Sequence, residues 1–89
     1  MIRESDIEGY LHKRVIQMGG EIRKVNWIGR RGAPDRCVML PGGRLIWVEC
    51  KAPGEIPEAH QDREHERLRR VGQIVEVVDS LERVDEALS

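Results

Sequence analysis

The sequence predicts an α/β fold in the order αβββαβα, with a mixed four-stranded sheet flanked by helices. Three observations lead to this prediction. Apolar residues recur at helical spacing near both ends of the chain, and a segment between them is dense in helix formers. Short β-rich runs are set off by Pro-Gly-Gly and single Gly turn signals. A passage from strand to helix to strand then implies a right-handed crossover and a parallel strand pair.

The first helix is expected over residues 5–18. Its apolar residues have helical spacing: Ile7, Leu11, Val15 and Met18. Ser5 and Glu8 have the spacing of a capping box, and Gly19-Gly20 supplies the stop. Residues 21–27 follow with apolar side chains in a mostly polar background, and they are interpreted as a weaker strand.

Two further strands are expected at 36–40 and 44–50, because both runs are rich in β-formers and Pro41-Gly42-Gly43 separates them as a hairpin turn. Prolines and a glycine forbid regular structure over 52–57. The next run, 58–71, consists mostly of helix formers and ends before Gly72, so it is expected to be a helix.

The last strand is expected at 74–78, where four of the five residues are Ile or Val. Asp79 and Glu82 can then cap a final helix that runs through Leu88. There is no repeat and no linker, so residues 1–89 are predicted to form a single domain.

Composition limits the function classes. With three aromatic residues in 89, the core must be aliphatic and leaves little room for an enclosed ligand cavity, so a partner subunit would help. The sequence has no membrane-length apolar run and no apolar leader, which predicts a soluble, cytoplasmic protein. A net charge of −1 excludes a uniformly basic protein that coats nucleic acid, so any nucleic-acid binding must come from local clusters.

Cys37 and Cys50 stand in apolar strand-like runs without metal-type spacing. They are interpreted as reduced core residues, which disfavours a structural zinc site. Because they are expected on opposite faces of the hairpin, a disulfide between them is disfavoured.

Two charged residues lie at the end of the strand expected at 44–50, one within it and one directly after it. The period of two puts Glu49 and Lys51 on the same face as Leu45 and Trp47. The spacing alone is common, and a surface pair at a frayed strand end is the competing interpretation.

The hairpin register adds a second carboxylate. If the loop is Pro41 to Gly43, Leu40 pairs with Arg44 and Asp35 falls opposite Glu49. A two-residue loop would instead place Asp35 diagonal to Glu49. Like charges across a strand pair are destabilising unless a cation lies between them, and hard oxygen ligands suit Mg²⁺ or Mn²⁺.

Basic residues surround the approach to Asp35. Arg30, Arg31 and Arg36 stand beside the expected metal site and are candidate contacts to a DNA phosphate backbone. Arginines around a glycine loop are also ordinary solvated surface, and that alternative stays open.

Two helical residues are further candidates. Glu8 borders the apolar stripe of the first helix and can supply a third carboxylate, or it can act only in the capping box. Gln61 continues an apolar stripe and needs a partner, such as a metal-site carboxylate, Lys51, a bound water or a phosphate, unless it lies in a solvated first turn. The three histidines are assigned to the surface: His12, His60 and His65.

Together, Pro34-Asp35, the Glu49-Cys50-Lys51 motif and the αβββαβ order resemble the PD-(D/E)XK nuclease superfamily. The segments 32–35 and 48–54, followed by Gln61, are similar to the VRR-NUC family of virus-type replication-repair nucleases. The likeness runs from the first helix to the last strand.

This resemblance implies a metal-dependent phosphodiesterase related in fold to Holliday junction resolvases. Asp35, Glu49 and the backbone carbonyl of Cys50 would ligate Mg²⁺ or Mn²⁺, and Lys51 would orient or activate the attacking water. Glu8 matches the helical acid of the superfamily and is a candidate further ligand, while Gln61 matches the helical glutamine of the family.

The resemblance also implies a small homodimer, often phage-encoded, that cuts branched DNA in a bacterial or phage-infected cell and needs no organic cofactor. The rivals are a non-catalytic DNA-binding module of the same fold and a nuclease subunit of a larger repair or restriction assembly. A small interaction domain with structural charge pairs is a third.

Overall fold

The computed structural model describes residues 1–89. Its elements follow the predicted order: α1 (Glu4–Gln17), β1 (Glu21–Lys24), β2 (Arg36–Leu40), β3 (Arg44–Cys50), α2 (Ala59–Arg70), β4 (Val75–Val78) and α3 (Leu81–Leu88). The predicted bounds of β2 and β3 are confirmed. None of the three helices combines the length and apolar composition that a membrane span requires.

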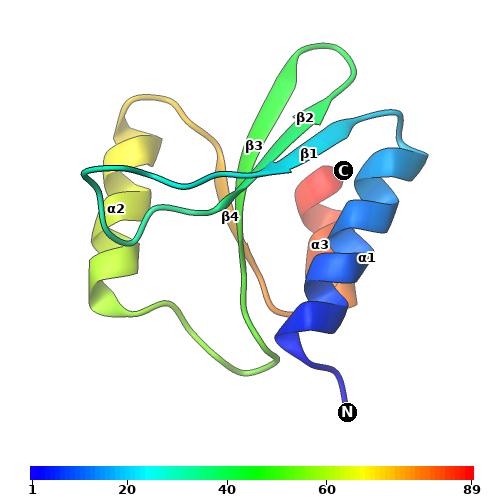
Figure 1. Cartoon of the computed structure of the whole chain (residues 1–89), viewed down its shortest axis with the longest axis horizontal. Coiled ribbons are helices and arrows are strands. Elements are labelled where there is room, and N and C mark those ends of the chain that lie inside the picture. Colours follow the sequence, from blue (N-terminus) through cyan, green and yellow to red (C-terminus); the bar gives the residue numbers. More distant parts are fainter.

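The four strands form one sheet in the order β1-β2-β3-β4. The pairs β1–β2 and β2–β3 are antiparallel, whereas β3 and β4 are parallel and joined through α2. The predicted mixed sheet with one crossover is therefore confirmed (Figure 1).

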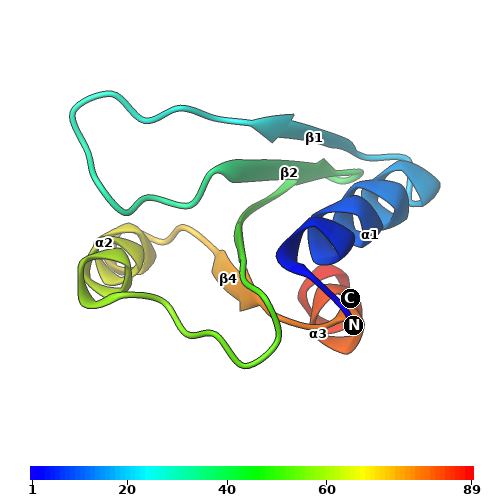
Figure 2. The same ribbon diagram turned by 60° about the horizontal axis from the view of Figure 1, so that its bottom comes forward.

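Helices cover both faces of this sheet. Figures 1 and 2 show α1 and α3 side by side against one face, with α2 on the other side. The main core lies between the sheet and the α1–α3 layer and is aliphatic, as the composition predicts: Ile7, Leu11, Val15, Ile22, Val38, Leu40, Ile46, Val48, Cys50, Val78, Val84, Ala87 and Leu88.

The α2 face of the sheet has the two tryptophans. The rings of Trp27 and Trp47 lie 4.9 Å apart between centroids, and Trp27 donates its indole N–H to the carbonyl of Pro34 at 2.8 Å. The prediction of a strand over 21–27 was therefore too long, because β1 ends at Lys24 and Trp27 instead packs against Trp47 with the rings inclined at 55°. The segment 25–35 becomes a long connection that reaches α2.

Two predicted helix caps were wrong. Arg3 is the N-cap of α1, and its backbone N–H donates to the carboxylate of Asp6 at 2.8 Å, so Ser5 and Glu8 form no capping box. Asp6 stands three residues after the N-cap, where an acidic side chain reaches back to the free N–H. At α3 the cap is Ser80 rather than Asp79, and its hydroxyl accepts the N–H of Arg83.

Candidate active site

The β2–β3 hairpin fixes the relation between the two predicted carboxylates. Its three-residue turn has Gly42 and Gly43 at φ of 86° and 80°, a region that glycine adopts without strain. Leu40 pairs with Arg44, and the register continues to Arg36 opposite Val48. Extension by one residue places Asp35 opposite Glu49, which excludes the diagonal arrangement of a two-residue turn.

Glu49 occupies an unfavourable position for a negative charge. Its side chain is 14% exposed. Burial raises the pKa of its carboxyl to about 7, and the charge of Asp35 acts in the same direction, against the smaller opposing effect of Lys51. A second cation close to both carboxylates would relieve this repulsion.

Lys51 is held by a residue of α2. It follows the last residue of β3, and its ammonium donates to Oε1 of Gln61 at 3.0 Å. The same oxygen accepts the backbone N–H of Glu58, the N-cap of α2, at 2.9 Å. Among the partners predicted for Gln61, the structure thus selects Lys51, and the alternative of a solvated first turn is wrong.

The connection 25–35 is pressed against the start of α2. Gly32 has a φ of 87°, and a Cβ at this position would lie 2.9 Å from the carbonyl oxygen of His60 and 3.1 Å from Cα of Gln61. Only glycine allows this approach without displacement. Arg30 and Arg31, which directly precede this contact, are both exposed.

Arg36 has a different environment from the one predicted. Its side chain is 16% exposed, with Nη2 2.5 Å from Glu8 and Nη1 3.0 Å from Asp35. It points to the α1 face of the sheet, because alternate residues of β2 point to opposite faces. Arg36 thus lies between two carboxylates, and its contact to DNA stays a prediction.

Glu8 is likewise engaged on the α1 side. It pairs with Arg36, and no three His, Cys, Asp or Glu side chains approach closely enough to form a metal-ligand cluster. Glu8 is thus linked to Asp35 through Arg36, and its role as a further metal ligand stays a prediction. Glu4, one turn earlier on α1 and not singled out from the sequence, adds to the charges that raise the pKa of Glu49.

Cys50 presents its two polar groups differently. Burial raises the pKa of its thiol to about 12, so the sulfur stays protonated among the core residues. Its backbone carbonyl, in contrast, belongs to the end of β3 beside Glu49. Both cysteines are buried free thiols.

The assignment of all three histidines to the surface was wrong for His65. His12 is exposed and His60 half-buried, whereas His65 is fully buried against the α2 face of the sheet. Its Nε2 lies 4.0 Å from Oε1 of Glu49. The burial of His65 could have been predicted from its spacing from Gln61, because residues four apart share one face of a helix.

Known proteins resemble this chain over nearly its whole length. A curated protein named "Putative nuclease p44", from Acyrthosiphon pisum secondary endosymbiont phage 1, is 52% identical over 80 residues, which are 90% of this chain and 86% of that protein. A solved structure described as a VRR_NUC domain superposes with a TM-score of 0.89 at 40% identity, covering 99% of this chain and 96% of the other. The chain belongs to the VRR-NUC family of nucleases. No family model matches it.

The candidate site of this VRR-NUC chain lies at the start of β2 and the end of β3, the two inner strands of the sheet, and not in an enclosed pocket. One hollow of about 390 Å³ lies between α1 and β1 beside Glu8 and Arg36. Another of about 280 Å³ lies on the outer surface of α2. Neither is lined by Asp35, Glu49 or Lys51.

Proposed function

We propose that this VRR-NUC chain is a Mg²⁺- or Mn²⁺-dependent DNA endonuclease that cuts structured or branched DNA such as a Holliday junction. One observation carries the proposal. Asp35 directly precedes β2, whose register pairs Arg36 with Val48, so Asp35 comes opposite Glu49, and its charge raises the pKa of that residue. Lys51, two residues after Glu49, donates a hydrogen bond to Gln61. Two hard oxygen ligands beside a lysine suit the hydrolysis of a phosphodiester.

The side chains at this site fit a divalent cation. Asp35, Glu49 and the carbonyl of Cys50 supply oxygen only, which favours Mg²⁺ or Mn²⁺ over softer metals. The raised pKa of Glu49 indicates that burial and Asp35 penalise its charge. A bound divalent cation would offset that penalty. A solvated surface pair would have no such penalty to offset.

Each residue then has a defined part. Asp35, Glu49 and the Cys50 carbonyl hold the ion, which when bound makes water more acidic and offsets charge on the scissile phosphate. Lys51 places its ammonium beside the reacting phosphate, where it stabilises developing negative charge and orients the attacking water. The hydrogen bond to Gln61 holds that ammonium in place.

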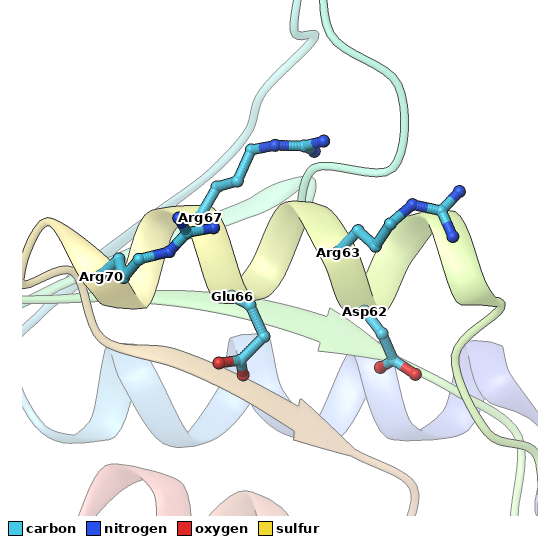
Figure 3. A pocket seen from close by; sticks show the side chains of 5 residues that line it. All are labelled: Asp62, Arg63, Glu66, Arg67 and Arg70. Carbon is cyan, nitrogen blue, oxygen red and sulfur yellow. The ribbon is translucent and has the colours of Figure 1, made fainter.

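Arginines on one side of α2 extend the DNA contact. Figure 3 shows Arg63 and Arg67 reaching from α2 to one side, while Asp62 and Glu66 point to the other. Arg63 and Arg70 form no ion pair with a carboxylate, so their guanidinium groups are free for phosphate. We propose that these two arginines, together with Arg30 and Arg31, contact the DNA backbone.

We also propose that the protein acts as a homodimer. Its core is small for an independent domain, and Met39 and Leu45, which pair across the hairpin, are 37% and 38% exposed. Two active sites related by a two-fold axis match the symmetry of a four-way junction. Light scattering tests this point: a dimer mass is expected, and a monomer at assay concentration contradicts it.

Cleavage of labelled DNA tests the proposed activity. Four-way junction, flap, duplex and single-stranded DNA are incubated with protein and Mg²⁺ or Mn²⁺. Cleavage of the junction or flap is expected with wild-type protein and is absent with EDTA or with Asp35→Ala. If wild-type cleaves none of the four above the level of Asp35→Ala, the rival of a non-catalytic DNA-binding module gains support.

A further inference from the structure

His65 is a buried polar side chain without a hydrogen bond. Its side chain is 1% exposed, and neither Nδ1 nor Nε2 has a hydrogen-bond partner. Buried polar atoms are nearly always paired, since leaving one unpaired forfeits the hydrogen bonds that water supplied. An apolar residue of similar shape would fill this space without that cost. A histidine at this position therefore implies a hydrogen-bond partner nearby.

The carboxylate of Glu49 is the one acidic group within 4.0 Å of His65. Nε2 lies 4.0 Å from Oε1, so the two atoms must approach by about 1 Å to form a hydrogen bond. An imidazole ring carries at least one N–H, and neither ring nitrogen of His65 has another partner, so Nε2 can be the donor to this carboxylate.

The spacing of α2 matches the spacing of β3. Residues four apart on a helix are separated by about 6 Å along its axis. Residues two apart on a strand are separated by about 6.6 Å. Gln61 contacts Lys51, and His65 faces Glu49. The helix therefore runs antiparallel to the strand here, and each of the two charged strand residues faces one polar residue of the helix.

We propose that His65 is a positioning residue that donates a hydrogen bond from Nε2 to Oε1 of Glu49. This bond holds one carboxylate oxygen on the α2 side and leaves the other for a divalent cation shared with Asp35. The inference rests on the proposed metal-dependent function. Hydrogen-bond partners of ligating carboxylates commonly change metal affinity by about tenfold to a hundredfold.

Two substitutions separate this role from simple packing. His65→Leu keeps the bulk but removes the donor, whereas His65→Gln retains an N–H donor. Isothermal titration of the metal-free proteins with Mn²⁺ should give about tenfold or weaker affinity for His65→Leu. His65→Gln should stay within about threefold of wild-type. Melting temperatures without metal should not follow this order, because the leucine also removes the buried Nδ1, which has no partner.

A measurement on wild-type protein covers the case in which His65→Leu does not fold. Long-range ¹H–¹⁵N spectra of the Mn²⁺-free, Mg²⁺-loaded protein should show His65 with its proton on Nε2. A proton on Nδ1, or Mn²⁺ affinity unchanged in His65→Leu, would overturn this inference alone. Wild-type protein that binds neither ion would overturn it together with the proposed function.

Discussion

Lys51 and Gln61 are joined by a hydrogen bond of 3.0 Å between Nζ and Oε1, across the gap between the end of β3 and the first turn of α2. Because Oε1 also accepts the N–H of Glu58, one side chain caps α2 and positions the lysine. The stability of the helix start and the geometry of the site therefore depend on the same atom.

Gln61→Ala should lower both stability and cleavage. Loss of the cap costs about 1 kcal/mol, and release of Lys51 should reduce the cleavage rate by roughly tenfold or more. Ser80→Ala is the matched control, because it removes the cap of α3 far from the site. Thermal melts and initial rates are compared. Equal loss of cleavage in both variants would mean that Gln61 acts only through stability.

The raised pKa of Glu49 predicts how the metal-free protein responds to pH. Since this pKa is about 7 when folded and 4.5 in the reference state, the folded protein holds the proton more tightly. The resulting stabilisation is complete below pH 4.5 and is lost as the pH rises through 7. Its upper bound is about 3 kcal/mol.

Glu49→Gln removes this titration while keeping the shape of the side chain. In EDTA, the melting temperature of wild-type should fall relative to the variant between pH 4.5 and pH 8. Stabilisation of wild-type by Mn²⁺ should be larger at pH 8 than at pH 6, because ligation requires the carboxylate. Melting curves of the two proteins that stay parallel across this range contradict the assigned pKa.

Gly32→Ala should displace the connection 25–35 from α2. The new methyl group would lie 2.9 Å from the backbone of His60, in addition to the strain of a positive φ. Gly29→Ala is the control, because Gly29 has a φ of 84° and no atom within 4 Å of the added Cβ. That control should lose about 1–2 kcal/mol, and Gly32→Ala should lose more and also cleave slowly. Similar losses in both would show that the contact is unimportant.

Arg63→Ala and Arg70→Ala should weaken DNA binding without changing the fold. Each phosphate contact that is lost should make the salt dependence of log K shallower by about 0.9. Fluorescence anisotropy in EDTA at several salt concentrations measures this slope. Lys13→Ala is the control, since Lys13 is exposed on α1, away from α2. Slopes equal to wild-type in both arginine variants would exclude α2 from the DNA contact.

The central geometry of the site was predictable because it depends on local rules. The Pro41-Gly42-Gly43 turn sets the hairpin register, and strand alternation then places Asp35 and Glu49 opposite each other. These rules need no knowledge of how helices pack. The functional roles of the two carboxylates stay predictions until they are measured.

Features that depend on tertiary packing were predicted less well. The pairing of Arg36 with Glu8 requires α1 to lie over β2, and the burial of His65 requires α2 and the connection 25–35 to close over the sheet. The start of α1 was misjudged for a local reason, since Asp6 and Glu8 both have cap-like spacing and only one can be used.

Cleavage of a labelled four-way junction in Mg²⁺ should be compared for wild-type, Glu49→Gln and Lys51→Met protein. Wild-type should cleave the junction in a reaction that EDTA abolishes, and each variant should lose at least about a hundredfold in rate while still binding the junction in EDTA. Cleavage by the variants at the wild-type rate would contradict the assignment of Glu49 and Lys51 to the active site.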